Sequence, residues 1–253
     1  MKKILAIVLA LAMVLSALAC AKKAEPAAAD VAKGEGVMTY EEYAAASEDY
    51  ADVVIEAYVQ LLAYNQQYSN ANLYLADKDG GYFVYRMPCT DDDAAKLLPG
   101  TKVKISGQKG AYANEPEIAE GSATYEIEEG SYIAEAKDIT SILGNDDELY
   151  KLVNQLVAIK GAKVVASTVE GVDSDFWYGW ENTAKKGDNA DLYFNIEVNG
   201  QVFNMCVESD EWKEGSDVYT AVESLKIGDT VDLEGFLYWY YGANPHISAV
   251  KAA

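Results

Sequence analysis

The sequence is poor in the residues that most often build metal sites and catalytic pairs. Its 253 residues include a single histidine, His246. A histidine-based metal cluster and a pair of catalytic histidines are therefore excluded, and no G-x-S-x-G turn is present to complete a triad with His246. Glycine-rich phosphate-binding loops are absent as well. The sequence predicts a protein that is not an enzyme, with no catalytic residue, no metal and no cofactor.

Basic residues are also scarce. The chain has 20 Lys and Arg against 41 Asp and Glu, a formal net charge of -21. Affinity for phosphate backbones comes from Lys and Arg that displace counterions, so this composition predicts that nucleic acid is not a partner. Five prolines and 19 glycines are too few for low-complexity sequence, whereas 19 tyrosines and four tryptophans indicate buried cores. The length allows one large domain or two small ones.

Cysteine occurs only three times, at Cys20, Cys89 and Cys206. An even number of cysteines in an exported chain permits a disulfide, but two widely separated residues do not form a disulfide framework. We expect Cys89 and Cys206 to be free and buried.

The only long apolar run covers residues 4–15, which is shorter than the roughly 20 residues that a membrane span needs. Two lysines precede the run and small residues follow it, the order of a secretory signal. The ending Ala-Leu-Ala-Cys at Cys20 resembles a bacterial lipobox, although an ordinary cleaved signal with an incidental cysteine is the alternative. We expect a lipoprotein signal peptide over residues 1–19, lipidation of Cys20 and an Ala-rich flexible tether over 20–36. The protein would then be extracytoplasmic, anchored to the cell membrane by its lipid.

The rest of the chain contains an internal repeat. Residues 97–118 match residues 224–247, with glycines and valines in register, and residues 72–87 match residues 191–206. The matches occur in the same order in both halves, so the sequence predicts two copies of one small domain.

Each copy has the pattern of a small β-barrel. In the first copy, β-branched and aromatic residues indicate strands at 53–60, 73–77, 82–87 and 102–108, with a short strand near Glu117. Asp79-Gly80 and Asn199-Gly200 fit two-residue hairpin turns. A short helical segment with acidic residues at its start lies between the third and fourth strands of each copy. Five strands with a helix at this place are the order of the OB-fold.

These patterns predict a mainly β protein with two tandem OB-like five-stranded barrels and short helices. Thr39 and Glu42 form a capping box for a helix through about Glu48. The first domain would cover residues 37–144, including this helix and extra connector strands, and the second would cover 145–253.

Five segments carry a resemblance to a known class of proteins. They are TYEEY at 39–43, EAYVQ at 56–60, LYLADKDGGYFVY at 73–85, PGTKVKISG at 99–107 and GFLYWYYGANPHI at 235–247. Together they resemble tandem OB-fold lipoproteins of the exported, Firmicutes type. The resemblance implies the fold and an envelope location, and it implies no catalytic residue.

Aromatic residues are concentrated in two loops of the second copy, at 173–183 and 237–245. OB-folds commonly bind ligands at these loops, and flat rings suit stacking on sugars or on peptide groups. The sequence therefore predicts a monomeric, non-catalytic module that binds a glycan or a peptide or protein. The expected ligand-binding residues are Trp177, Trp180, Trp239, Tyr241, Tyr112 and Asn244.

Three alternatives remain open at this point. The same rings could fill the end of a barrel or the contact between barrels, since a small barrel needs large side chains. The protein could instead be a structural or assembly partner in an envelope complex. An unrecognised hydrolase is the third, because carboxylate pairs are plentiful among 41 acidic residues.

Overall fold

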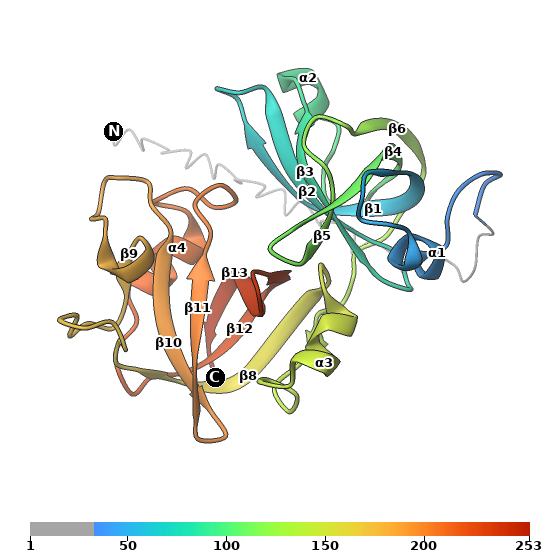
Figure 1. The fold of residues 1–253 in the computed structure, drawn as a ribbon. Coiled ribbons are helices and arrows are strands. Elements are labelled where there is room, and N and C mark those ends of the chain that lie inside the picture. Colours follow the sequence, from blue (N-terminus) through green and yellow to red (C-terminus); the bar gives the residue numbers. More distant parts are fainter. Residues whose placement is uncertain (1–32) are drawn as a thin grey trace, which may run out of the picture.

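The computed structural model describes residues 33–253 and contains two closed β-barrels that lie side by side (Figure 1). The predicted signal peptide and most of the predicted tether lie outside the described residues. Among the helices of residues 33–253, none is long and apolar enough to cross a membrane.

The first barrel has five strands and an added sixth. Its order is β1-β2-β3-β5-β4, and pairing of β1 with β4 closes the barrel. A short helix, α2, connects β3 to β4, and β6 extends the sheet beyond β4. The bounds are β1 Ala51–Asn65, β2 Asn70–Ala76, β3 Gly81–Pro88, α2 Asp91–Ala94, β4 Thr101–Tyr112, β5 Glu115–Ile118 and β6 Thr124–Ser131.

The second barrel repeats this topology. Its order is β8-β12-β13-β11-β10, closed by pairing of β8 with β10, and helix α4 connects β11 to β12. Two short strands, β7 and β9, pair with β8 and β10. The bounds are β7 Lys137–Asp138, β8 Leu156–Val165, β9 Trp177–Tyr178, β10 Leu192–Val198, β11 Gln201–Val207, α4 Asp217–Glu223, β12 Thr230–Trp239 and β13 Ala243–Ala252. The prediction of two tandem OB-like barrels with short helices is confirmed.

The connector between the barrels differs in detail from its prediction. Strand β7 already pairs with β8 and so belongs to the second sheet, ahead of Gly144. Helix α3 (Asp146–Leu149) and a 3-10 turn, η1 (Tyr150–Leu152), follow as a short helical segment. The division of the chain into domains at residue 144 remains a prediction.

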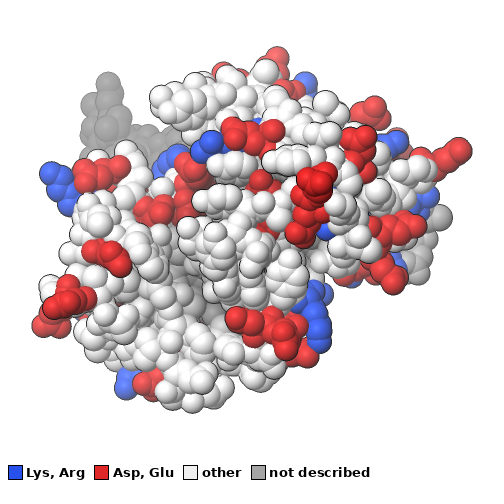
Figure 2. All heavy atoms as spheres, viewed as in Figure 1, with Lys and Arg blue, Asp and Glu red and all other residues white. Residues whose placement is uncertain are grey.

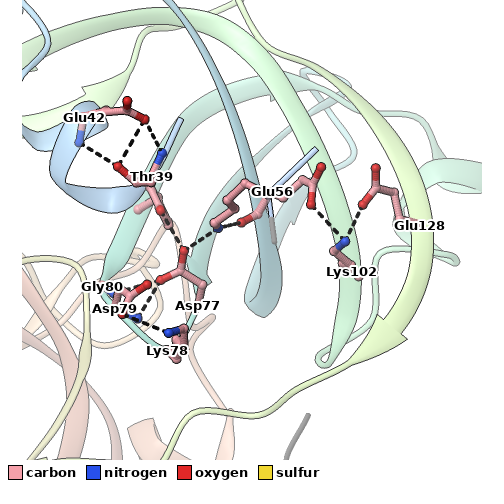
Figure 3. A network of polar contacts seen from close by, with 11 residues as sticks. Thr39, Glu42, Glu56, Asp77, Lys78, Asp79, Gly80, Lys102 and Glu128 are labelled. Atoms are coloured by element: carbon pink, nitrogen blue, oxygen red, sulfur yellow. Dashed lines mark hydrogen bonds and ion pairs between the residues drawn. The ribbon is translucent and has the colours of Figure 1, made fainter. Parts of the chain in front are cut away.

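The two predicted hairpin turns form by different means. Asn199 and Gly200 both have positive φ, 53° and 78°, as a type I′ turn requires. Asp77 instead organises the turn between β2 and β3, because its carboxylate accepts hydrogen bonds from the backbone N–H groups of Asp79 and Gly80 at 2.8 and 2.9 Å (Figure 3). Tyr82 and Lys33 also donate to this carboxylate.

Helix α1 (Tyr40–Ala45) begins at the predicted capping box: the Thr39 side chain accepts from the Glu42 N–H, and the Thr39 N–H donates to the Glu42 carboxylate at 2.8 Å. The helix ends earlier than predicted. The ammonium of Lys109, a β4 residue that is 2% exposed, donates to the carbonyl oxygens of Tyr43, Ala44 and Ala46. These carbonyls are therefore satisfied by a side chain and not by a further helical turn.

Each barrel has its own apolar core. Cys89 and Cys206 are free and buried, as predicted. A third, smaller cluster contains Tyr74 and Phe83 of the first barrel and Phe236 of the second. Tyr74 stacks on Phe236 with ring centroids 4.3 Å apart, and both rings are at most 4% exposed. The two barrels thus share a buried aromatic contact.

Equivalent hairpins of the two copies also meet at this contact. The β4–β5 turn of the first barrel lies against the β12–β13 turn of the second: the N–H of Trp239 donates to the carboxylate of Glu115 at 2.7 Å, and the N–H of Tyr241 donates to the carbonyl of Ala113 at 2.8 Å. A Cβ at Gly81 would lie 2.4 Å from the backbone of Asn154, so only glycine allows this approach. Polar bonds and close backbone packing add to the aromatic contact.

Candidate functional site between the two barrels

A cavity of about 640 Å³ opens where the barrels meet. Its walls come from β2, β3 and β4 of the first barrel, from helix α3, and from β10, β11, β12, β13 and neighbouring loops of the second. Eight of the lining residues are aromatic: Phe83, Tyr85, Tyr112, Trp180, Tyr193, Phe203, Tyr238 and Tyr240. Figure 2 shows acidic residues spread over the visible face, with a largely uncharged, hollowed area in its middle.

Apart from His246, every charged side chain that lines the cavity is acidic. Asp146, Glu208, Asp210 and Glu211 line the cavity, and no Lys or Arg does. Three of the four acids belong to the segment that follows β11. This segment is held as a turn, because the carbonyl of Glu208 accepts the N–H groups of Glu211 and Trp212 at 3.1 and 2.9 Å.

The floor of the cavity contains a buried polar chain that joins the barrels. Nδ1 of His246 lies 2.9 Å from Oε1 of Glu211 and 3.2 Å from the hydroxyl of Tyr74. The Tyr238 ring stacks on the imidazole with centroids 4.4 Å apart. Burial opposes protonation of His246, but the Glu211 carboxylate outweighs it and raises the pKa of the imidazole. Oε2 of Glu211 is buried and has no hydrogen-bond partner.

Glu208 also belongs to a group of three side chains whose possible metal-ligand atoms lie close together. Burial, followed by the neighbouring carboxylates, raises the pKa of Glu208 to about 8, even though His246 acts in the opposite direction. One atom each from Asp191, Cys206 and Glu208 lies within 4.8 Å of the others. Such a set could hold a metal ion. The prediction that the protein holds no metal remains untested.

Two of the predicted ligand-binding tryptophans are buried, Trp239 in the core of the second barrel and Trp177 in a separate cluster with Tyr193 and Cys206. Trp177 is 3% exposed and stacks on Tyr193, and Trp239 is 6% exposed and packs edge-on against Tyr150. Neither indole can stack on an external ligand, because its faces are covered by protein. The rim of exposed tryptophans that the sequence suggested does not exist, and the packing alternative holds for these two rings.

The other predicted residues have different locations. Trp180, Tyr112 and Asn244 line the cavity, with Trp180 62% exposed. Tyr241 is 74% exposed and is not among the cavity residues. Cys20 lies outside the described residues. The structure therefore brings three of the six predicted ligand-binding residues to one cavity.

Sequence reasoning missed the acidic side of the cavity. Glu208, Asp210 and Glu211 occur in the run ESDE directly after a strand. The only local signal is that three of four consecutive residues are acidic, and this signal is weak in a chain with 41 acids. The sequence did not single out Tyr74 either, because its position in a strand fits that of an ordinary core residue.

No protein-family model and no curated protein sequence matches the chain. Several solved structures resemble it. One is described as the tetrameric p202 HIN2, with 12% identity, a TM-score of 0.33, and coverage of 82% of this chain and 97% of that chain. Another is a murine DNA-binding protein bound with double-stranded DNA, with 12% identity, a TM-score of 0.36, and coverage of 79% and 96%. A third is p202 HIN1 in complex with a 12-mer double-stranded DNA, with 15% identity, a TM-score of 0.33, and coverage of 82% and 96%.

These similar structures correct two predictions. The exclusion of nucleic acid as a partner is contradicted, because two of the three structures contain double-stranded DNA. The prediction of a surface module that binds a glycan or a peptide or protein through rings in its loops is contradicted by the same finding. Burial of Trp177 and Trp239 also removes its physical reason. Net charge describes a whole chain and leaves the chemistry of any one surface undetermined.

Proposed function

We propose that the protein is a receptor for a small organic molecule, which it holds in the cavity between its two barrels. The observation that carries this proposal is the enclosure of about 640 Å³ by eight aromatic side chains from both barrels. Cavities of roughly 300–1,000 Å³ with mostly apolar walls and a few polar groups are typical of small-molecule sites. This site differs from the aromatic loops that the sequence predicted, both in its location and in the class of its ligand.

The cavity is formed in advance of binding. The stacked pair Tyr74 and Phe236 and the backbone contact of Gly81 with Asn154 set the position of one barrel against the other. A preformed site does not lose binding energy to ordering its walls. We also retain the prediction that the protein is not an enzyme, which is supported by the absence of a histidine pair and of a nucleophile turn in the sequence.

Filling the cavity tests this proposal. Ala243 lines the cavity, and Ala243→Trp is expected to weaken binding of small aromatic probes at least tenfold, because the indole takes up the space. Saturation-transfer NMR with a mixed set of neutral, cationic and anionic aromatic molecules measures binding to the full chain. Trp180 fluorescence is a second readout, since this indole lines the cavity.

Ala45→Trp is the matched control, since Ala45 is exposed on helix α1. It should bind the probes as the unmodified protein does. A short DNA duplex belongs in the same titration, because double-stranded DNA is present in two similar structures. Equal probe binding by the Ala243→Trp and Ala45→Trp variants would contradict the cavity as the site.

We further propose, on the N-terminal sequence alone, that the protein is a lipoprotein anchored to the outer side of the cell membrane through Cys20. The support is the order of two lysines, an apolar run and small residues before Cys20. Cys20→Ala is expected to move the protein from the membrane fraction to the soluble fraction, because a diacyl anchor would be lost. Fractionation followed by immunoblotting measures this, and an unchanged membrane fraction would contradict the anchor.

A further inference from the structure

Resting on the proposed function, we infer that the ligand is a protonated primary or secondary amine with an apolar or aromatic body, and that Glu211 receives its N–H groups. This chemical class of ligand follows from the hydrogen bonds of Glu211, from the charges of the residues that line the cavity and from the aromatic rings in its walls.

One carboxylate oxygen of Glu211 has no hydrogen-bond partner among the described residues. Its side chain is 1% exposed, and its Oε1 is used by Nδ1 of His246 at 2.9 Å. Oε2 has no partner and belongs to a residue that lines the cavity. A buried carboxylate oxygen left without a hydrogen bond is unfavourable, so a donor on the ligand would stabilise the complex.

The charges that face Glu211 favour a cation. His246 pairs with one oxygen of Glu211, and the carboxylates of Asp146 and Asp210 line the same cavity with no lysine or arginine among the described lining residues. The hydroxyl of Tyr74 is the other polar group that contacts His246. An anionic ligand would be repelled by the carboxylates of Asp146 and Asp210, whereas an ammonium would be attracted to them.

The aromatic walls agree with the same class. Tyr193 and Tyr238 line the cavity near the acids, and ring faces attract cations, more strongly when the cation is shielded from water. Rings alone would accept a quaternary ammonium equally well. The unpartnered Oε2 of Glu211 separates the two classes, because a quaternary ammonium has no N–H to donate. The site therefore fits an ammonium that carries hydrogen.

Four probes with one shared body test the inference on the full chain by isothermal titration calorimetry. They are phenethylammonium, trimethyl(phenethyl)ammonium, phenethyl alcohol and 3-phenylpropionate. Phenethylammonium is expected to bind about tenfold more tightly than the alcohol, because a charge-assisted hydrogen bond is stronger than a neutral one. The quaternary probe should fall between these two, and the carboxylate should bind most weakly.

Glu211→Gln should remove most of the preference for phenethylammonium and leave affinity for the alcohol within about twofold, because the amide keeps an acceptor for His246 but loses the charge. Asp210→Asn provides a second variant at an exposed position, where loss of one charge should weaken phenethylammonium by about two- to fivefold. Glu126→Gln, at an exposed position on β6, is the matched control and should change nothing.

The outcomes separate the inference from the proposed function. If the alcohol and phenethylammonium bind equally and neither acidic variant alters this, the cavity remains a receptor site and the amine class is wrong. If the quaternary probe equals phenethylammonium, the role of Oε2 as a hydrogen-bond acceptor is wrong. If no probe binds, the receptor function itself is overturned.

Discussion

Replacing Tyr74 with alanine is expected to lower the free energy of unfolding by about 3–5 kcal/mol, the usual range for removing a large buried aromatic side chain. Tyr74 is 0% exposed, stacks on Phe236 across the two barrels and lies 3.2 Å from His246 through its hydroxyl. The substitution leaves a cavity in the shared cluster and removes a polar partner from a buried imidazole. Urea unfolding followed by fluorescence and circular dichroism measures the change.

The same variant should uncouple the barrels, because their shared aromatic cluster contains only Tyr74, Phe83 and Phe236 as buried members. In calorimetry we expect two separated unfolding transitions for this variant, whereas the transitions of the unmodified protein should lie closer together. Tyr68→Ala is the matched control, since Tyr68 is 68% exposed, and it should change stability by no more than about 0.5 kcal/mol. Equal losses for the two variants would show that Tyr74 does not stabilise the contact.

The stability of the protein is expected to decrease between about pH 4.5 and pH 8. Burial, followed by the charge of Glu120, raises the pKa of Glu117 from 4.5 to about 7. The folded chain therefore keeps a proton that the unfolded chain has released. A raised carboxyl pKa gives a contribution that is complete below the unfolded pKa and is lost as the pH rises through the folded pKa. At 1.36 kcal/mol for each pKa unit, the upper limit of the loss from Glu117 is about 3 kcal/mol, and screening by solvent reduces it.

Other titratable groups with shifted pKa values also shape this dependence of stability on pH. Burial also raises the pKa values of Glu115 and Glu208, and, despite burial of the imidazole, the Glu211 carboxylate raises that of His246, so all three act in the same direction as Glu117. Asp93 acts oppositely: hydrogen bonds from Tyr125 and Thr90 lower its pKa to about 2, and that contribution is lost only as the pH falls toward this value. Maximum stability is thus expected near pH 4.5.

Glu117→Gln tests the assignment. The neutral amide cannot titrate, so this variant should show a flatter profile between pH 4.5 and 8, while Glu126→Gln should keep the original slope because Glu126 is exposed. Urea midpoints measured at half-unit pH intervals give both profiles. A Glu117→Gln profile that overlies that of Glu126→Gln would rule out Glu117 as the source.

The barrels themselves were accessible from the sequence because they depend on local patterns. Alternating residues, the Asn199-Gly200 turn and the capping box of Thr39 and Glu42 each act within a few positions, and all three appear in the structure. The end of helix α1 was not accessible. It is decided by Lys109, which is more than 60 residues away along the chain.

The candidate site was accessible only in part. Trp180, Tyr112 and Asn244 were chosen from loop position, and they do line the cavity. Trp177 was chosen for the same reason but is buried against Tyr193, in a cluster separate from the core of the second barrel. Loop position does not distinguish the two indoles, because exposure depends on which neighbours cover a ring.

The amino-acid sequence by itself determined that this chain forms two copies of one barrel, because repeated residue types and short-range periodicity are written in the order of the chain. Only the tertiary structure decided where the barrels touch, which tryptophans are covered and that Glu211 has an oxygen without a partner. The cavity exists between surfaces of two separately closed barrels. Its shape and charge follow from contacts between residues that are distant in sequence, such as Tyr74 with Phe236.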